Sequence, residues 1–415
     1  MKRTFVMGLA ALATVGASAV VAQQQKPATT ARPVFTPDGI VHVPAFDLPP
    51  STLISPEALA LQKARSAMPP ADNLMISGTI AERRAAVERM MASQVTEMNQ
   101  RYSVDIVEQR IAGVRTRIVT PKGGEADRNR VLINLHGGGF MMCAEGCAIL
   151  ESVPVAAVGK FKVVTVDYRQ GPENAFPAAS EDVASVYQEL LKSYRPENIG
   201  IYGCSAGGAL TAQSMAWFAD KKIPMPGAIG IFGAGGVRFG AGDSAYVTGY
   251  IDGSFPPPGP NGETFPIPYF RTVKMDDPLV SPAAYPEVAA KFPPTLLITG
   301  TRSMDMSPAI YTHNRLLKAN VRSQLIVGEG MGHCYIYQSR LPEARDAYDE
   351  IVKFFDENLG HRGKGGSGPA SAAAAPVRRE EHQSPAKDCV EHTNVRTQTP
   401  GADGKFWFPV KKKNC

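Results

Sequence analysis

The sequence predicts an α/β protein in which a mainly parallel sheet is covered by helices on both faces. From residue 103 onward, short apolar runs typical of strands recur, and helical patterns separate the later ones. Parallel neighbours need a crossover connection, usually a helix, so this alternation favours a doubly wound sheet. The residues with the clearest chemistry also follow strand-like runs, and the carboxyl ends of parallel strands are where such sheets bind ligands.

The expected elements follow one another in a regular order, and the first two strands form an antiparallel hairpin. The strand-like runs are 103–107, 114–119, 131–135, 162–166, 199–202, 228–232, 295–299 and 324–327. The helical patterns are 178–194, 209–220, 307–319 and 342–358. Eight strands with helices between the later ones predict one α/β domain over residues 101–360.

Residues 23–100 precede every expected strand of this sheet. Prolines dominate 23–50, which favours an extended lead-in. A helix is expected from Ser55, with Ser55 as its cap and Pro56 in its first turn. A second helix is expected over 80–100, where Val87, Met90, Met91, Val95 and Met98 recur at helical spacing. The two helices could form an outer layer of the core or part of a cap.

The segment 233–282 interrupts the regular order of strands and helices. It is rich in Gly and Pro and shows no sustained period. Because insertions of this length are usually functional, we expect a cap that shapes a substrate pocket. The alternative is a surface loop without regular structure.

Both ends of the chain differ in composition from the α/β domain over residues 101–360. Residues 1–22 combine Lys2 and Arg3 with an apolar stretch, and the pattern predicts a secretory signal peptide cleaved before Gln23. This implies a periplasmic or secreted protein, with a membrane anchor as the alternative. Residues 361–385 have linker composition, and 386–415 form a tail containing three consecutive lysines.

Composition excludes several classes of function. The chain has 415 residues, of which 44% are hydrophobic and 20% charged, and a formal charge of +5 without a basic stripe. Nucleic acid is therefore not an expected partner. No Cys/His cluster has zinc-like spacing and the phosphate-loop pattern G-x-x-x-x-G-K-[ST] is absent, so no metal or cofactor is expected.

Export would allow the six cysteines to form disulfides. Cys143 and Cys147 are close in sequence, and Cys389 and Cys415 both lie in the tail, so each couple is expected to pair. Cys204 and Cys334 adjoin candidate catalytic residues, and we expect them to be small buried hydrophobic side chains.

The stretch Gly203-Cys204-Ser205-Ala206-Gly207-Gly208 lies between a strand-like run and a helical pattern. In that context G-x-S-x-G predicts a nucleophile elbow, a sharp turn that exposes the serine hydroxyl beside the next N–H group. Ser205 is therefore the candidate nucleophile. The alternative is an ordinary Gly/Ser-rich loop.

A second motif, His136-Gly137-Gly138-Gly139-Phe140, directly follows the strand-like run 131–135. Glycines that leave a strand can direct their N–H groups toward one point, as a developing oxyanion requires. The expected oxyanion donors are the N–H groups of Gly138, Gly139 and Ala206. His136 is expected to hold the loop rather than to transfer protons.

Together these motifs resemble the hormone-sensitive-lipase-like branch of the α/β-hydrolase superfamily, which includes bacterial carboxylesterases. The resemblance covers roughly residues 100–358 and rests on 136–140, 167–173 (DYRQGPE), 176–179, Asp182 and 203–208. It implies an α/β-hydrolase fold with a cap and a serine mechanism that needs no cofactor. One departure is Cys204, because the family commonly has Asp or Glu at this position.

A serine nucleophile needs a base and an acid, which follow it in that fold in the order acid, then histidine. His333 follows the last strand-like run in the family's Gly-x-x-His pattern and is the expected base, whereas His313 lies in a helical pattern. Asp305 is the expected acid, although Ser303 holds the place where the family usually has it. Glu329 is a second candidate, and Asp305 could instead cap the following helix.

The sequence thus predicts a serine carboxylesterase that hydrolyses short-to-medium acyl esters through an acyl-enzyme. The expected partner is a small ester, and no membrane span is expected once the signal peptide is removed. Two alternatives remain: a peptidase or amidase on the same fold, and a non-catalytic ligand-binding relative.

Overall fold

The computed structural model describes residues 32–65, 78–123, 126–248, 251, 259, 266–360, 389–390 and 412–413. The chain divides into two units, Met1–His361 and Arg362–Cys415. In the second unit, the described residues form two short antiparallel strands, β11 (Cys389–Val390) and β12 (Lys412–Lys413). The expected signal peptide, the expected linker and the expected pairing of Cys389 with Cys415 lie outside the described residues, so they stay predictions.

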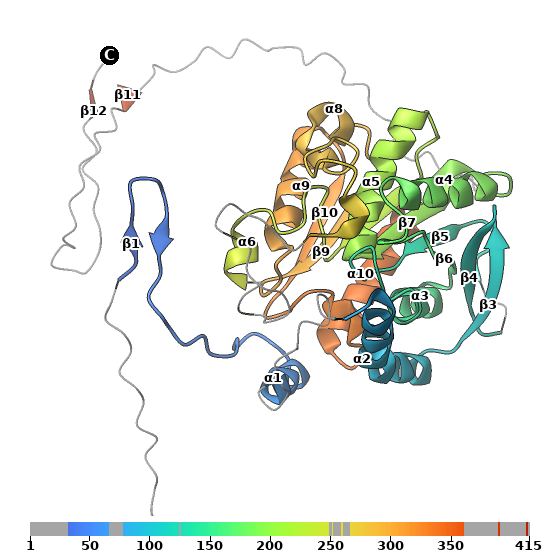
Figure 1. Ribbon diagram of the computed structural model, residues 1–415, viewed down its shortest axis with the longest axis horizontal. Coiled ribbons are helices and arrows are strands. Elements are labelled where there is room, and N and C mark those ends of the chain that lie inside the picture. The colour runs from blue at the N-terminus through green and yellow to red at the C-terminus, as the bar shows by residue number, and fades with distance from the viewer. Residues whose placement is uncertain are drawn as a thin grey trace, which may run out of the picture. The chain divides into compact units, whose positions relative to one another are not determined.

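The first unit is built on an eight-stranded sheet with the order β10-β9-β8-β7-β5-β6-β4-β3 (Figure 1). Its strands are β3 (Val104–Ile111), β4 (Val114–Pro121), β5 (Val131–Leu135), β6 (Lys162–Val166), β7 (Ile199–Cys204), β8 (Ala228–Phe232), β9 (Thr295–Gly300) and β10 (Ser323–Gly328). In this sheet β3 pairs antiparallel with β4, β4 is antiparallel to β6, and every other pair of neighbouring strands is parallel. The predicted mainly parallel sheet is therefore confirmed.

Helices cover both faces of this sheet. On one face lie α4 (Ala178–Leu190), α5 (Ala206–Lys221) and α9 (Met306–Lys318), and on the other lie α3 (Gly146–Gly159) and α10 (Pro342–Asn358). Side chains alternate between faces along a strand. On β5, accordingly, Ile133 and Leu135 join the first core cluster and Leu132 joins the second.

The sequence pattern did not predict α3, although this helix lies at the centre of the second face. Ten of its 14 residues are buried, and Pro154 lies inside it. A helix that is apolar on all sides has no polar face and hence no readable helical period. It packs against both α2 (Ile80–Arg101) and α10.

The two N-terminal helices begin as expected. In α1 (Pro56–Ala64), the Ser55 hydroxyl accepts from the Ala58 N–H, and α2 has a complete capping box formed by Thr79 and Glu82. Before them, the proline-rich lead-in contains a small hairpin of β1 (Val34–Phe35) and β2 (Val41–His42). None of the described helices has the length and apolar character needed to cross a bilayer.

The remaining short elements lie in connections. They are η2 (Pro196–Asn198), α6 (Asp243–Tyr246), η3 (Pro268–Phe270), η4 (Pro282–Ala284), α8 (Pro286–Ala289) and η5 (Tyr335–Tyr337). In the described part of the 233–282 insertion, Tyr269 and Phe270 are buried, and the Tyr269 ring stacks on Phe140 with centroids 5.0 Å apart. This end of the insertion is therefore part of the core beneath the glycine-rich loop.

Candidate active site

Ser205 lies at a sharp turn between the end of β7 and the start of α5. Its backbone φ of 58° and ψ of −122° are rare for a residue with a side chain, and such strain is concentrated at functional sites. A Cβ atom at Gly203 or Gly207 would collide with the carbonyl oxygen of Leu135. Glycine is required at both positions because the turn lies directly against β5.

The structure brings Ser205, His333 and Asp305 together. The Ser205 Oγ lies 2.9 Å from His333 Nε2, and His333 Nδ1 lies 2.7 Å from Asp305 Oδ1. His333 follows β10, and Asp305 lies between β9 and α9. With a proton on Nδ1 donated to the carboxylate, Nε2 is left as an acceptor for the serine hydroxyl. This is the geometry that activates a serine nucleophile.

Asp305 is fully buried and held by two further hydroxyl groups. Thr299 Oγ1 donates to its Oδ2 at 2.6 Å, and Ser303 Oγ donates to its Oδ1. Burial raises the pKa of Asp305, but the hydrogen bonds from His333, Ser303 and Thr299 outweigh it, and the net pKa lies below its ordinary value. The carboxylate is thus ionised at neutral pH beside the histidine.

The two-residue displacement of Asp305 is accommodated by the turn after β9. Ser303 occupies the place usual for the acid, and its hydroxyl supports Asp305 instead. Asp305 makes no side-chain capping bond to α9, so capping does not explain its position. Glu329 accepts from the Ser51 hydroxyl at 2.7 Å, and His313 Nδ1 lies 2.9 Å from Ser323 Oγ.

The glycine-rich loop after β5 has the backbone conformation that only glycine adopts readily. Gly138 has a φ of 107° and Gly139 a φ of 64°, and a Cβ at Gly138 would collide with the Met142 carbonyl. The Gly137 N–H donates to Glu151 Oε1 at 2.9 Å, so it is not directed at a substrate. The N–H groups of Gly138, Gly139 and Ala206 remain the candidate oxyanion donors.

His136 holds this loop in place. Its Nδ1 lies 2.7 Å from the Gly137 carbonyl oxygen, and its ring stacks on Tyr168 at a centroid distance of 4.3 Å. Burial lowers the pKa of His136, which keeps the imidazole neutral. Tyr168 Oη in turn donates to the His136 carbonyl at 2.7 Å. These contacts fit a structural role for His136.

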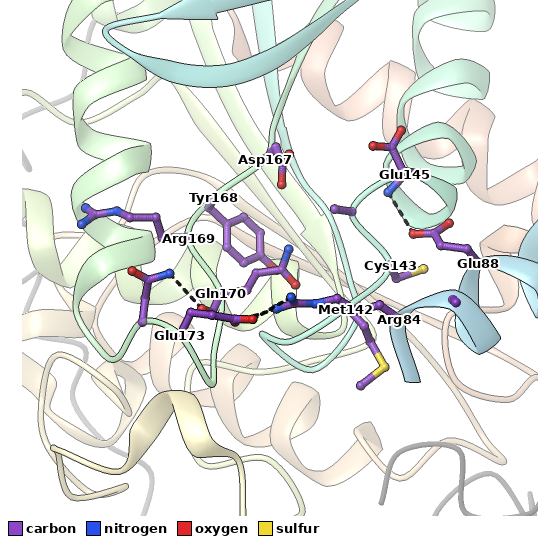
Figure 2. Close-up of a pocket in the computed structure, with 13 residues that line it drawn as sticks. Arg84, Glu88, Met142, Cys143, Glu145, Asp167, Tyr168, Arg169, Gln170 and Glu173 are labelled. Atoms are coloured by element: carbon purple, nitrogen blue, oxygen red, sulfur yellow. Dashed lines mark hydrogen bonds and ion pairs between the residues drawn. The ribbon is translucent and has the colours of Figure 1, made fainter. Parts of the chain in front are cut away.

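The block 167–173 forms the outer support of the same loop. The Gly171 N–H donates to the Phe140 carbonyl at 2.8 Å. From α2, Arg84 donates to the carbonyls of Met141 at 2.7 Å and Gly171 at 3.1 Å, and pairs with Glu173 at 2.8 Å (Figure 2). A cleft of about 590 Å³ lies among these residues, and none of Ser205, His333 and Asp305 lines it. The block is therefore a structural support.

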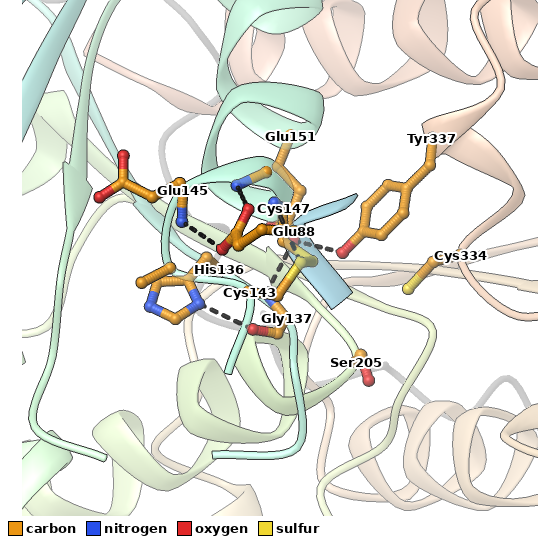
Figure 3. Close-up of a disulfide and its surroundings, with 12 residues drawn as sticks. Glu88, His136, Gly137, Cys143, Glu145, Cys147, Glu151, Ser205, Cys334 and Tyr337 are labelled. Atoms are coloured by element: carbon orange, nitrogen blue, oxygen red, sulfur yellow. Dashed lines mark hydrogen bonds between the residues drawn. A yellow bond between two sulfur atoms is a disulfide. The ribbon is translucent and has the colours of Figure 1, made fainter. Parts of the chain in front are cut away.

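Two disulfides lie near the site. The predicted bond between Cys143 and Cys147 is present (Figure 3). The expectation for Cys204 and Cys334 was wrong, because these two cysteines form a second disulfide instead of packing as free thiols. The sequence did not reveal this bond because its cysteines are 130 positions apart and meet only in the folded sheet. One precedes Ser205 and the other follows His333.

The insertion and the N-terminal helices both contact loops of the site. The Phe239 ring lies 5.9 Å from the His333 ring in an edge-on arrangement, and Thr248 Oγ1 donates to the Ser303 carbonyl at 2.7 Å. From α1, Gln62 Nε2 donates to the Gly330 carbonyl at 3.0 Å. These segments thus border the histidine and the turn that holds the acid. Among the described residues, no three His, Cys, Asp or Glu side chains form a group suited to a metal ion.

The comparisons with known proteins agree with this architecture. A family model described as an α/β hydrolase fold matches residues 132–337, from the glycine-rich loop's strand to the histidine loop. Among solved structures, esterase E25 is 28% identical, with a TM-score of 0.66 over 77% of this chain and 99% of that one. An esterase from the bacterial hormone-sensitive lipase family is 23% identical, with a TM-score of 0.62 over 73% of this chain and 97% of that one.

The chain has the α/β-hydrolase fold. Two curated proteins match parts of it. An esterase of Acinetobacter venetianus is 23% identical over 61% of this chain and 83% of that protein. LipR of Mycobacterium tuberculosis is 37% identical over 123 residues, which cover 29% of this chain and 39% of LipR, less than two thirds of its length.

One polar residue of this hydrolase's site was not expected from the sequence. Glu151 lies on α3 with only 2% of its surface exposed and contacts both the glycine-rich loop and the residue before Ser205. Its one sequence signal is a lone carboxylate within the apolar run 147–158.

Proposed function

We propose that this hydrolase is a serine carboxylesterase that cleaves short-to-medium acyl esters. The observation that carries the proposal is the continuous hydrogen-bonded chain from Ser205 through His333 to Asp305. A non-catalytic relative would be expected to have lost one of these groups or its geometry. The esterases among the structural neighbours support the same reaction class.

In the proposed mechanism, His333 Nε2 takes the hydroxyl proton as Ser205 Oγ attacks the ester carbonyl. Asp305 orients His333 and stabilises its charged form, as the acid of a triad does. The N–H groups of Gly138, Gly139 and Ala206 would stabilise the oxyanion, where charge develops in the transition state. His333 then protonates the departing alcohol, and water hydrolyses the acyl-enzyme with the same base.

The decisive experiment replaces Ser205 by Ala and measures hydrolysis of p-nitrophenyl acetate and butyrate. Loss of the nucleophile should lower kcat by roughly 10⁴-fold or more, because the remaining triad members cannot act without it. Turnover at the wild-type rate in the purified variant would refute the assignment. A series of longer acyl esters, assayed on the wild type, then measures the preferred chain length.

Export to the periplasm or the medium is part of the same proposal. It is supported by the signal-peptide pattern of residues 1–22 and by two disulfides in the described fold, since disulfides persist in oxidising compartments. N-terminal sequencing of the protein from its native host should find a mature chain beginning at Gln23. A chain that retains Met1 in the cytosolic fraction would contradict export.

A further inference from the structure

A buried carboxyl group lies beneath the catalytic loops and outside the triad. Glu151 is in the middle of α3, within a mostly apolar helix, and is 2% exposed. A carboxylate removed from water in this way is costly unless hydrogen bonds replace its hydration. A carboxyl group at this position therefore needs hydrogen-bond donors, and four donors contact it.

The four donors are divided evenly between the two carboxyl oxygens. Oε1 accepts from the Gly137 N–H at 2.9 Å and from Tyr337 Oη at 2.6 Å. Oε2 accepts from Asn134 Nδ2 at 2.8 Å and from the Cys204 N–H at 3.1 Å. In Figure 3, Tyr337 points at Glu151 from the right and Gly137 lies below it.

Three of these donors belong to three different parts of the site. Gly137 is in the glycine-rich loop, Cys204 immediately precedes Ser205, and Tyr337 is in the short helix η5 that follows His333. One carboxyl group thus connects the oxyanion loop, the nucleophile elbow and the histidine loop. A core residue that served only packing would not need backbone bonds to two catalytic turns.

Each bond has a geometric consequence for catalysis. Glu151 engages the Gly137 N–H, which leaves the oxyanion role to the next two peptide units of the loop. It also fixes the Cys204 peptide, and with it the strained turn that presents Ser205. At position 204 the family commonly carries a carboxylate, whereas here Cys204 is engaged in a disulfide and a carboxyl group reaches the elbow from α3.

The four donors favour the charged form of this group, because both of its oxygens then act as acceptors. Burial raises the pKa of Glu151 to about 7, against the hydrogen bonds from Tyr337, Asn134, Gly137 and Cys204, which lower it. Burial also raises the pKa of Tyr337 well above its usual range, and the nearby Glu151 adds to that effect. Tyr337 therefore remains neutral and can donate its hydroxyl proton.

We propose that Glu151 is a positioning residue that holds the oxyanion loop, the nucleophile elbow and the histidine loop in mutual register. The role rests on the proposed esterase function, since it concerns the same site. It acts through backbone N–H groups and Tyr337, without contact to substrate.

The test is Glu151→Gln, which preserves shape but replaces one acceptor oxygen by an NH₂ group that must face two donors. We expect kcat on p-nitrophenyl butyrate to fall roughly 10- to 100-fold with little change in KM, because displacement of oxyanion donors of this kind has effects of that order. Rates are expressed per active site, titrated to the end point with a fluorophosphonate. A merely structural role would lower the titrated fraction and leave kcat per site unchanged.

Glu88→Gln is the matched control. Glu88 accepts the backbone N–H groups of Glu145 and Gly146 at the start of the same helix, at 3.2 and 2.8 Å, without contact to the catalytic turns. Its kcat per site should stay within about twofold of the wild type, since surface-side changes away from a site have small effects.

Tyr337→Phe removes one of the four donors, the Tyr337 hydroxyl group, and is the variant to measure if Glu151→Gln does not fold. It should lower kcat per site by several-fold, and wild-type values in whichever of the two variants folds would overturn the positioning role. Wild-type turnover is measured first, so that the two claims are separated. Absence of turnover and of fluorophosphonate labelling in the wild type would contradict the esterase function itself.

Discussion

Asp305 illustrates how a single carboxylate can be buried and still remain charged. Burial alone would favour its neutral form, but a histidine and two hydroxyl groups donate to it, and its pKa falls below the ordinary value. A carboxyl pKa that is lower in the folded protein than in the unfolded chain stabilises the fold at any pH above the unfolded-state pKa. This stabilisation is lost as the pH falls through the folded-state pKa. The acid of the site thus also contributes to stability at neutral pH.

Replacing Asp305 by Asn should lower kcat by roughly 10⁴-fold with a small change in KM, because an amide can stabilise the wrong tautomer of His333. The assay is steady-state hydrolysis of p-nitrophenyl butyrate. Glu329→Gln is the control, since Glu329 pairs with Ser51 at the surface. Wild-type kcat in Asp305→Asn combined with loss of activity in Glu329→Gln would reverse the assignment of the acid.

The raised pKa of Glu151 predicts a pH-dependent stability. The pKa of Glu151 is about 7 in the folded protein, above the ordinary 4.5. The group therefore stabilises the fold at a pH below its unfolded-state pKa, and this stabilisation is lost as the pH rises through its folded-state pKa. The wild-type Tm should therefore fall relative to that of Glu151→Gln between about pH 5 and pH 8. The adjacent tyrosines Tyr168, Tyr202 and Tyr337 do not titrate there, because burial raises each pKa well above its usual range. Parallel Tm curves for the two proteins would contradict the prediction.

At the scale of elements, the site is assembled from strand ends and the loops that leave them. β7 presents Ser205, β9 leads to Asp305 and β10 leads to His333, while β5 leads to the glycine-rich loop. Arg84 of α2 donates to the Met141 carbonyl next to that loop, and Glu151 of α3 accepts the Gly137 N–H within it. The disulfide between Cys204 and Cys334 adds a covalent link between the nucleophile turn and the histidine loop.

Removing that disulfide by Cys204→Ala with Cys334→Ala should lower the free energy of unfolding by about 2–5 kcal/mol, because it closes a long loop. The measurement is denaturant unfolding together with kcat per titrated site, which should also fall. The matched control is Cys143→Ala with Cys147→Ala, whose bond spans only 4 positions and constrains the unfolded chain less. Equal losses in both double variants, or none in the first, would contradict the loop-length argument.

At the scale of the molecule, the order of strands and helices could be predicted from the sequence because each is encoded locally. Apolar runs define the strands, and β10 and α10 were expected within one or two residues of their observed bounds. The elbow and the glycine-rich loop were recognisable for the same reason, since both consist of consecutive residues whose small size the backbone requires.

Features that depend on the assembled fold were not predictable in the same way. α3 is buried on nearly all sides and has no period, so its sequence gave no helical signal. Cys204 meets Cys334, and Glu151 meets Gly137 and Tyr337, only once the sheet has formed. These long-range contacts are therefore the part of the site that the local sequence motifs could not predict.

The central claim is that Ser205 is the nucleophile of an ester hydrolase, and covalent labelling tests it most directly. The purified protein and its Ser205→Ala variant are treated with a fluorophosphonate, and the labelled peptide is mapped while p-nitrophenyl butyrate hydrolysis is followed. We expect one phosphonyl group on Ser205, loss of hydrolysis in step with labelling, and no label on the variant. Labelling at another residue, or hydrolysis that continues after Ser205 is modified, would contradict the account.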